Sequence, residues 1–292
     1  MEPSDEPTDT DIAALDDAFR LLANETRLEI LRALWDAPSW TATYSELKDA
    51  VELGDSGTFQ YHLRQLTGTF IEQTDDGYHH LTSGITVVRA MLSAVNASPE
   101  PVEAIPLEAR CSTCDTPYAA VYVNQVFEIQ CRECDEHVFK IPFPPAGLQG
   151  RSAEERIAAF DRWSRRLISL ACDGVCPWCS GAMSTRVLLD DPEPFGYPVR
   201  VDHECAHCDA FFHTSLGHNV FDHPAVVGFF TDHGFDVDSV PLWDLGFCSA
   251  DAEVAVLRRE PLRTQLQITL DSETLRLVFD DEAAVVESER ES

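Results

Sequence analysis

The chain has 292 residues, which is enough for two or three domains of ordinary size. Hydrophobic residues make up 44% of it, so the composition excludes a disordered chain. No stretch approaches the roughly 18–20 consecutive apolar residues of a membrane-spanning helix. The acidic, polar start is also unlike a secretory signal, which is basic and then apolar. The sequence therefore predicts a cytoplasmic protein with no membrane association.

Acidic residues are in large excess, because 51 Asp and Glu stand against 21 Lys and Arg for a net charge of −30. Lys48 and Lys140 are the two lysines, and the acids are spread over the whole chain. Carboxylates hold hydrated cations, so the pattern is typical of proteins that work in molar salt and predicts a halophilic archaeal protein. At the two ends, residues 1–10 and 287–292, the same composition predicts disordered tails.

The first third of the chain has the apolar spacing of a helical domain with one β-hairpin. Ile12, Leu15, Phe19 and Leu22 recur at intervals of three and four residues, which predicts one face of a helix. Asp75-Asp76-Gly77 is a turn signal between two β-like runs. In chain order, we expect helices over residues 11–22, 25–36, 45–51 and 56–66, strands over 70–73 and 78–81, and a last helix over about 86–95.

Four segments of this region resemble the ArsR-type regulators of haloarchaea: LLANETRLEILRAL at 21–34, YSELKDAV at 44–51, SGTFQYHLRQL at 56–66 and DDGYHHLT at 75–82. The resemblance implies a winged helix-turn-helix DNA-binding domain over residues 11–97. It further implies that 56–66 is the recognition helix and that the 71–81 hairpin is the wing. It also implies that the first and last helices pair two chains in a homodimer.

One side of the expected recognition helix is free to reach double-stranded DNA. Phe59, Leu63 and Leu66 repeat at four and three residues and face the core. The other side carries the candidate DNA-binding residues, which are Ser56, Thr58, Gln60, Tyr61 and Arg64. Arg64 can bond guanine through two hydrogen bonds, and Gln60 can serve adenine. Ser56 or Tyr61 suits a phosphate.

The charge balance leaves a second interpretation of this domain open, in which it binds a protein. Residues 43–91 hold three Lys or Arg and seven acids, and His79 and His80 stand on the expected wing where Lys or Arg is usual. In molar salt, however, counterion release drives little binding. A halophilic DNA-binding protein therefore depends on shape and base contacts.

Ten cysteines include four C-x-x-C pairs, which in a protein without an export signal predict metal sites and not disulfides. After a linker over residues 98–109, the first two pairs are Cys111/Cys114 and Cys131/Cys134. Two residues between thiolates let both sulfurs reach one tetrahedral ion. The spacer AAVYVNQVFEIQ is β-like on both sides of its Asn, so a hairpin can bring the two pairs together. This pattern predicts a zinc ribbon.

A second quartet repeats the plan with a longer spacer, in Cys176/Cys179 and Cys205/Cys208. A β-like run and then a helix follow each quartet, the helices over about 153–170 and 223–233. We therefore expect a diverged duplication of one ribbon–helix unit that holds two structural zinc ions. Four cysteines close the shell, whereas a catalytic zinc keeps one position open. A redox role is the other interpretation of the Cys-Pro-Trp-Cys motif.

Six histidines lie between residues 203 and 233, where they can hold a further metal ion or, more simply, serve as hydrogen-bonding surface groups. Cys172 and Cys248 are left over, and we expect both to be small buried residues. Cys172 is close enough to the second quartet to replace one of its ligands.

The chain from residue 235 onward is β-like and carries no enzyme motif. The runs TQLQITL and TLRLVFDD predict a hairpin, and no nucleotide-binding, metalloprotease or nucleophile-elbow pattern occurs. The nearby aromatic residues are expected in the core, namely Phe229, Phe230, Phe235, Trp243 and Phe247. Residues 106–286 resemble the zinc-ribbon domain that follows this type of winged helix in haloarchaeal regulators.

Together these patterns predict an α+β chain, with an N-terminal winged helix-turn-helix followed by a tandem zinc-ribbon and β-rich domain over residues 110–286. The favoured function is a DNA-binding transcriptional regulator, homodimeric, whose C-terminal domain serves an effector or a protein partner. The alternative is an adaptor whose zinc ribbons bind a protein of the transcription machinery without sequence-specific DNA binding. Neither function is enzymatic.

Overall fold

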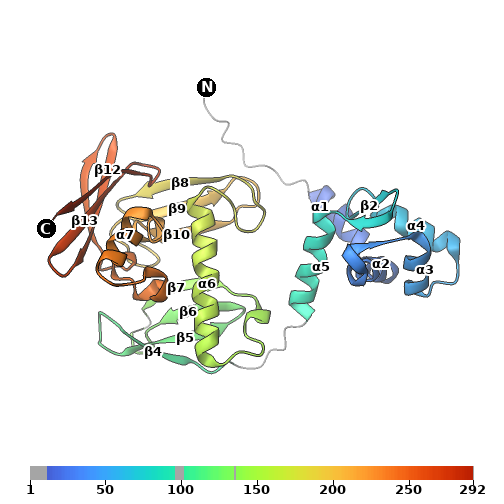
Figure 1. Ribbon diagram of the computed structural model, residues 1–292, viewed down its shortest axis with the longest axis horizontal. Coiled ribbons are helices and arrows are strands. Elements are labelled where there is room, and N and C mark those ends of the chain that lie inside the picture. The colour runs from blue at the N-terminus through green and yellow to red at the C-terminus, as the bar shows by residue number, and fades with distance from the viewer. Residues whose placement is uncertain (1–11, 96–101, 135, 292) are drawn as a thin grey trace. The chain divides into compact units, whose positions relative to one another are not determined.

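The computed structural model describes residues 12–95, 102–134 and 136–291, and it has an α+β architecture (Figure 1). The chain divides into two compact units between Pro99 and Glu100, inside the stretch expected as a linker. The acidic tail expected over residues 1–10 lies outside the described residues. None of the described helices is long and apolar enough to cross a membrane.

The N-terminal unit is helical with one small sheet. Its elements are α1 (Ile12–Leu22), α2 (Glu25–Asp36), η1 (Pro38–Trp40), β1 (Thr41–Ala42), α3 (Tyr44–Val51), α4 (Ser56–Leu66), β2 (Ile71–Thr74), β3 (Gly77–His80) and α5 (Thr82–Val95). The strand β1 was not expected, and α5 begins earlier than predicted. Gly84 lies in the first turn of α5, and glycine is unfavourable in helices, so the sequence did not indicate a helix there. A Cβ at this position would lie 2.2 Å from the Phe70 carbonyl oxygen, so the close approach of the two segments requires glycine.

Polar caps fix where three of these helices begin. The Asn24 side chain accepts a backbone N–H at the start of α2. Thr43 and Glu46 form a reciprocal capping box at α3, and the Asp55 carboxylate accepts two backbone N–H groups at α4. Each cap contributes about 1 kcal/mol to helix stability. The caps therefore define α3 and α4 as two separate short helices, with only four residues between them.

One apolar cluster holds the N-terminal unit together. Phe59, Leu63 and Leu66 of α4 are buried as predicted, and they pack with residues of α2, α3 and β2, among them Ile30, Leu31, Leu34, Leu47, Val51 and Ile71. Each such side chain contributes about 1.5–3 kcal/mol when fully buried. Beside them lies an antiparallel sheet with the strand order β1-β3-β2.

The C-terminal unit contains three antiparallel sheets and two α-helices among its described residues. Its elements are β4 (Ile105–Arg110), β5 (Pro117–Val123), β6 (Val126–Gln130), β7 (His137–Pro142), η2 (Pro145–Gly147), α6 (Ala153–Cys172), β8 (Met183–Leu188), β9 (Arg200–Cys205), β10 (Phe211–Ser215), η3 (Gly217–Asn219), α7 (Pro224–Asp232), η4 (Val237–Ser239), η5 (Leu242–Asp244), η6 (Gly246–Cys248), β11 (Glu253–Arg259), β12 (Leu262–Leu270), β13 (Glu273–Phe279) and β14 (Val285–Glu291).

The helix α6 runs across the first two sheets, which have the orders β4-β5-β6-β7 and β10-β9-β8 (Figure 1). Its Phe160 is fully buried and stacks on Phe127 of β6, with ring centroids 4.3 Å apart, and on Trp243 of η5 at 5.7 Å. One continuous apolar cluster therefore joins both sheets, α6 and the 3-10 turns.

A buried ion pair attaches the 3-10 turns to α6. The Arg165 guanidinium lies 2.9 Å from the Asp161 carboxylate, one helical turn away. The second oxygen of Asp161 accepts the backbone N–H of Leu242 at 2.7 Å, and Arg165 also donates to the Val237 carbonyl. Because removal of either partner leaves a buried charge uncompensated, loss of one of them should destabilise the packing of the turns on α6.

The prediction of a disordered tail over residues 287–292 is wrong for residues 287–291, because they form most of β14. This strand pairs antiparallel with β13, for example Glu287 with Val278 and Arg290 with Leu275, and closes a sheet of order β11-β12-β13-β14. The acidic composition that suggested disorder suits an edge strand, because charged side chains discourage pairing with another chain. The predicted hairpin of this sheet is confirmed, since Leu270 pairs with Glu273.

Three further expectations are corrected. The linker does not extend to residue 109, because residues 105–110 form β4, an edge strand that tolerates Pro106. The apolar spacing in residues 153–170 predicts Leu170 on the same buried face as Phe160 and Leu167, but Leu170 is 41% exposed, and Phe235, expected in the core, is 53% exposed. Leu170 is the last member of its apolar repeat and Phe235 follows the end of α7, so spacing alone does not indicate the buried side at either position.

Candidate functional site

Each C-x-x-C pair lies in a tight turn that is closed by the same backbone hydrogen bond. The N–H of the first cysteine donates to the carbonyl oxygen five residues later, at 2.8–2.9 Å in all four turns. The bonded residues are Cys111 and Thr116, Cys131 and Glu136, Cys176 and Gly181, and Cys205 and Ala210. The same order of elements also occurs twice. A cysteine turn, two strands, a second cysteine turn, a third strand and a helix follow one another, with β5, β6, β7 and α6 in the first copy and β8, β9, β10 and α7 in the second. Both quartets thus have the repeated plan expected from the sequence.

The residue directly after the second cysteine is left-handed in each of the three turns where the structure describes it. Asp115, Ser180 and Asp209 have φ of 59°, 60° and 55°. Asp is among the residues that adopt this conformation most readily outside glycine. The left-handed residue reverses the chain, so that both sulfurs of a pair lie on the same side of the turn.

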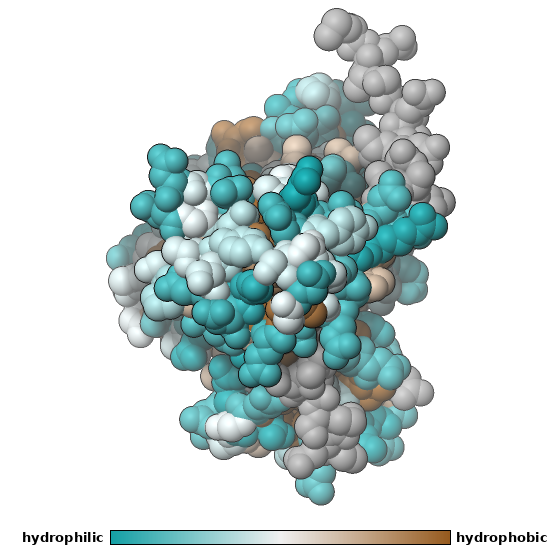
Figure 2. Space-filling view, turned by 90° about the vertical axis from the view of Figure 1, so that its right-hand side faces the viewer, coloured by the Kyte–Doolittle hydropathy of each residue, from teal (hydrophilic) through white to brown (hydrophobic). Residues whose placement is uncertain are grey.

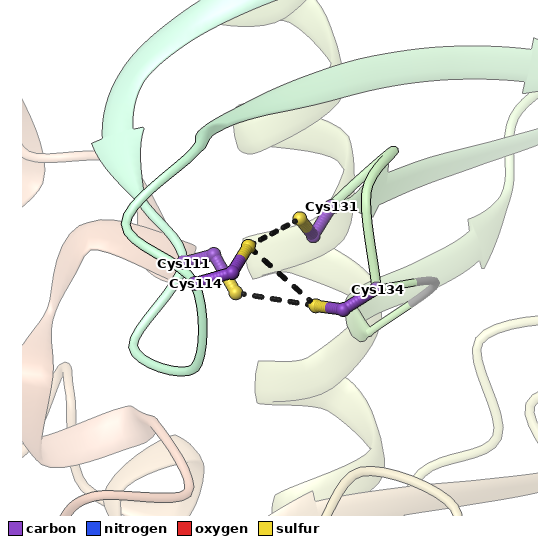
Figure 3. A group of neighbouring side chains, drawn as sticks. All are labelled: Cys111, Cys114, Cys131 and Cys134. Carbon is purple, nitrogen blue, oxygen red and sulfur yellow. Dashed lines mark hydrogen bonds between the residues drawn. The ribbon is translucent and has the colours of Figure 1, made fainter.

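The first quartet joins the turn before β5 to the turn after β6. The sulfurs of Cys111 and Cys134 are 3.5 Å apart, those of Cys114 and Cys131 are 3.4 Å apart, and those of Cys114 and Cys134 are 3.8 Å apart. Figure 3 shows the four side chains pointing toward one another from the two turns. Cys111 and Cys131 are buried, and the second cysteine of each pair is exposed.

The second quartet has the same geometry between the turn before β8 and the turn after β9. The sulfurs of Cys176 and Cys208 are 3.6 Å apart, and those of Cys179 and Cys205 are 3.5 Å apart. A Cβ on Gly181 would lie 3.1 Å from the Cys179 sulfur, a tight contact, so glycine gives this turn more room than a larger residue would. All four sulfurs of each quartet lie within 4.8 Å of one another, and each quartet can hold a metal ion.

The electrostatic surroundings of the two quartets differ. Glu136 lies beside the first quartet, with a carboxylate oxygen 3.0 Å from the Cys111 sulfur. Burial and this carboxylate raise the pKa of Cys111. In the second quartet the backbone N–H of His207 points at the Cys205 sulfur at 3.4 Å and lowers the pKa of Cys205 to about 6. A carboxylate opposes a thiolate, whereas an N–H donor stabilises it.

The histidines between residues 203 and 233 do not gather around one point, and the two cysteine quartets are the metal-ligand groups found among the described residues. The expectation of surface histidines is wrong for His203 and His218, which are buried. His203 bonds Thr185 and Thr214 instead. His223 caps α7.

The two cysteines outside the quartets lie apart from them. Cys248 is buried, as expected. Cys172 is half-buried at the end of α6, with its sulfur 3.8 Å from a ring nitrogen of His203. Its sulfur belongs to neither group of ligands, so Cys172 does not replace a quartet member.

The five candidate DNA-binding residues are all exposed on α4. Gln60 and Arg64 are one helical turn apart, and Tyr61, 58% exposed, lies beside them, opposite the buried stripe. Gln65 is exposed one turn after Tyr61, and the same spacing could have identified it from the sequence. The surface over α3 and α4 faces the viewer in Figure 2 and is mostly hydrophilic.

Ser56 and Thr58 serve the start of α4 as well as facing solvent. The Thr58 hydroxyl donates to the Asp55 carboxylate, and the Ser56 hydroxyl accepts from the Lys48 ammonium at 2.6 Å. Lys48 therefore places a positive charge from α3 at the first turn of α4. Sequence reasoning did not single out Lys48, because this contact joins two helices.

The β2–β3 hairpin presents fewer polar groups than the sequence suggested. His79 is partly exposed and lies 3.4 Å from the Glu72 carboxylate across the hairpin. His80 is buried, with a ring nitrogen 3.1 Å from the Leu31 carbonyl oxygen. Burial lowers its pKa. His80 thus belongs to the core, and of the two histidines only His79 is on the outer surface.

Two family descriptions match the chain. One, Domain of unknown function (DUF7351), matches residues 108–285, which is more than half of the chain. The chain belongs to this family. A second, Domain of unknown function (DUF7347), matches residues 15–91. The two matches correspond to the C-terminal and N-terminal units. No curated protein and no solved structure matches the chain.

Proposed function

We propose that this protein is a DNA-binding transcriptional regulator whose N-terminal unit is an ArsR-type winged helix-turn-helix. The observation that carries the proposal is α4, which buries Phe59, Leu63 and Leu66 and leaves Gln60, Tyr61 and Arg64 on one exposed face. Its 11 residues include no acid. An exposed polar helix face with an arginine suits the major groove, which is wide enough for a helix.

The arrangement of the other elements supports the same domain type. The short α3 precedes α4, the hairpin β2–β3 follows it, and β3 pairs on its other side with β1 from the segment before α3. In this proposal α3 and α4 form the helix-turn-helix, and the hairpin is the wing.

Each exposed group on α4 has a role that its chemistry supports. Arg64 reads guanine through two hydrogen bonds, and Gln60, one turn earlier, reads an adjacent base. Tyr61 and the Lys48 ammonium contact phosphates and set the register on the duplex. The contact region has few positive charges, so base contacts and shape provide most of the affinity in molar salt.

In this proposal a zinc ion occupies each cysteine quartet and stabilises the C-terminal unit. A tetrahedral zinc with bonds of about 2.3 Å requires sulfurs about 3.8 Å apart. The five sulfur pairs described above, at 3.4–3.8 Å, are within a few tenths of an ångström of this, and all the sulfurs of a quartet lie within 4.8 Å of one another. Four thiolates leave no position for water or substrate, which supports a structural and not a catalytic role.

A homodimer formed through α1 and α5 is part of the proposal. Phe19 of α1 is 69% exposed, and Met91 of α5 is partly exposed, so both can contribute to it. Val88 of α5 is buried in the core of its own unit and does not contribute to the interface. The side chains of Ile12, Leu15 and Val95 lie outside the described residues. Light scattering at micromolar concentration tests for a mass of two chains.

Chromatin immunoprecipitation of the tagged protein from cells grown in their native salt tests the DNA-binding proposal. We expect discrete genomic sites that share a sequence motif, lost in the double variant Gln60→Ala/Arg64→Ala. Arg32→Ala is the matched control, because Arg32 is exposed on α2 and paired with Asp36. Enrichment that survives the double variant would instead favour the adaptor, which reaches DNA through a protein partner.

A further inference from the structure

An apolar cavity of about 450 Å³ lies in the C-terminal unit between β7 and β10, which are edge strands of its first two sheets. The strand β7 contributes Phe139, Ile141 and Pro142 to the wall, and β10 contributes Phe211 and Phe212. Sites for small organic molecules have volumes of roughly 300–1,000 Å³ and mainly apolar walls. This cavity has both properties.

One part of the wall is formed by a segment that the first copy of the repeat lacks. A two-residue turn connects β5 to β6 in the first copy, whereas residues 189–199 connect β8 to β9 in the second. This longer connection places Pro194, Phe195 and Tyr197 on the wall. The longer spacer of the second quartet therefore has a structural result, because it encloses an apolar space beside β10.

The connection is fixed by Arg200, a buried residue at the start of β9. The Arg200 guanidinium lies 2.9 Å from the Asp191 carboxylate and also donates to the Glu193 carbonyl oxygen. The rings of Phe195 and Tyr197 are in contact, with centroids 5.6 Å apart. Contacts within the protein therefore hold this part of the wall in place, as is usual for small-molecule sites.

The uncharged polar side chains on the wall bond to the protein and not to the space. The Thr214 hydroxyl donates to the Val201 carbonyl oxygen at 3.3 Å and accepts from the Asn219 amide at 2.9 Å. Neither ring nitrogen of His218 faces the space, since Nδ1 accepts the backbone N–H of Ser215 at 3.2 Å and Nε2 is inaccessible. Burial lowers the pKa of His218 to about 3, so its ring is uncharged. An occupant of the cavity therefore gains little from a hydrogen-bonding group.

Three wall residues can carry a charge near neutral pH, and none of them favours a charged occupant. The Lys140 ammonium is paired with the Glu128 carboxylate at 2.8 Å. His213 is paired with Asp202 at 2.7 Å. Asp209 is exposed, so its carboxylate is hydrated and attracts a cation only weakly in molar salt. A charged ligand would lose its hydration here without gaining a free counter-charge.

Two exposed aromatic side chains border the cavity on its solvent side. Phe211 is 66% exposed and Trp178 is 45% exposed. Trp178 lies between Cys176 and Cys179, and Phe211 is the third residue after Cys208, so each turn of the second quartet provides one of the rings. Covering such rings removes apolar surface from water, and aromatic rings pack favourably on one another. These rings therefore favour an aromatic occupant.

We propose that this cavity binds a small, neutral molecule of the fused-ring aromatic hydrocarbon class, held by apolar contact and ring packing and not by hydrogen bonds. Phe211 and Trp178 cover the ligand on its solvent side, and the connection between β8 and β9 contacts it from within the unit. The inference goes beyond the proposed regulator function and does not depend on DNA binding.

The test uses the full-length, metal-loaded protein in molar KCl, with N-phenyl-1-naphthylamine as a fluorescent reporter of apolar sites. Its fluorescence should rise to saturation at one site per chain. Naphthalene should displace it, whereas 2-naphthoate, which has the same rings and a carboxylate, should require at least about a tenfold higher concentration. Absence of saturable reporter binding, or equal displacement by naphthalene and 2-naphthoate, would overturn the proposal.

Two exposed phenylalanines give a matched pair of variants that locates the site. Phe211→Ala removes a ring from the border of the cavity and should weaken reporter binding at least about fivefold. Phe235→Ala removes a ring that is 53% exposed and is not part of the wall, so this variant should bind like the wild type. Equal affinities of the two variants would contradict the location of the site.

A second pair of variants fills the cavity instead of opening it. Val126 is on the wall, so Val126→Trp should weaken reporter binding at least about tenfold. Val286, an exposed residue of β14 outside the wall, provides the control variant Val286→Trp. Wild-type affinity in Val126→Trp would likewise contradict the location. Circular dichroism and metal content verify that each variant is folded.

Discussion

The two units of this protein are stabilised by different physical means. The N-terminal unit contains no cysteine and depends on one apolar cluster and capped helices, and its candidate functional residues are on an exposed helix face. All ten cysteines lie between residues 111 and 248, so the C-terminal unit adds two metal-ligand groups and buried polar networks to its core. Metal removal should therefore separate the units.

Chelation is expected to have the largest effect. Structural zinc contributes about 10–16 kcal/mol to the folding of small zinc domains, so a strong chelator should unfold the regions around both quartets. Hydrogen–deuterium exchange measured by peptide should show loss of protection in β5, β6, β8 and β9 and unchanged protection in α2 and α4. Metal analysis should find about two zinc ions per chain, and one in Cys111→Ser or Cys205→Ser.

A protein that remains fully protected at zero metal content would contradict the assignment of structural zinc. Loss of protection in α2 and α4 to the same degree as in the ribbons would contradict the independence of the two units. The cysteine variants distinguish these outcomes, because each removes one ion and leaves the other quartet as an internal reference.

Acid should destabilise the C-terminal unit through His218. Its pKa is about 3 in the folded protein and about 6.5 when unfolded, so the unfolded chain binds the proton first and stability falls as pH decreases below about 6.5. Between pH 7 and pH 5 this costs about 2 kcal/mol. Urea unfolding at saturating zinc, followed by tryptophan fluorescence, should show a smaller pH dependence in His218→Phe than in the wild type. The same pH dependence in both proteins would exclude this histidine as the cause.

A smaller effect is expected on the zinc affinities of the two quartets. Glu136 places a carboxylate at the first quartet where the second has Ala210, since both residues accept the closing bond of their turn. Glu136→Ala should raise the zinc affinity of the first quartet several-fold, because a carboxylate repels the thiolates. Glu133→Ala, an exposed acid in the same turn, is the control. Competition with a chromophoric chelator measures both, and equal effects would indicate only a change in net charge.

Local patterns in the sequence carried most of what could be predicted. The spacing of Phe59, Leu63 and Leu66 indicated which side of α4 is buried, and the two-residue gap within each cysteine pair indicated the metal-ligand turns. Both patterns span fewer than a dozen residues, so backbone geometry alone connects them to structure.

Contacts between distant residues could not be predicted in this way. The Lys48 contact with Ser56 joins two helices, and the cavity at His218 is formed by strands of two sheets. The strand β14 exists because β13 offers it a partner, while its acidic composition resembles that of a solvated tail. In each case the contact is made with another helix or strand that is distant in the sequence. The spacing of residues within one segment does not show which segment that is.

The binding of DNA by α4 is the central claim, and a titration of one genomic target fragment tests it most directly. Fluorescence anisotropy in about 2 M KCl should show that Arg64→Ala costs about 1–3 kcal/mol of binding free energy and relaxes the preference at one base pair, while Arg32→Ala binds like the wild type. The affinity of the wild type should depend only weakly on KCl concentration, because few cations meet the phosphates. Equal affinities of the wild type and Arg64→Ala would contradict the claim that α4 reads DNA.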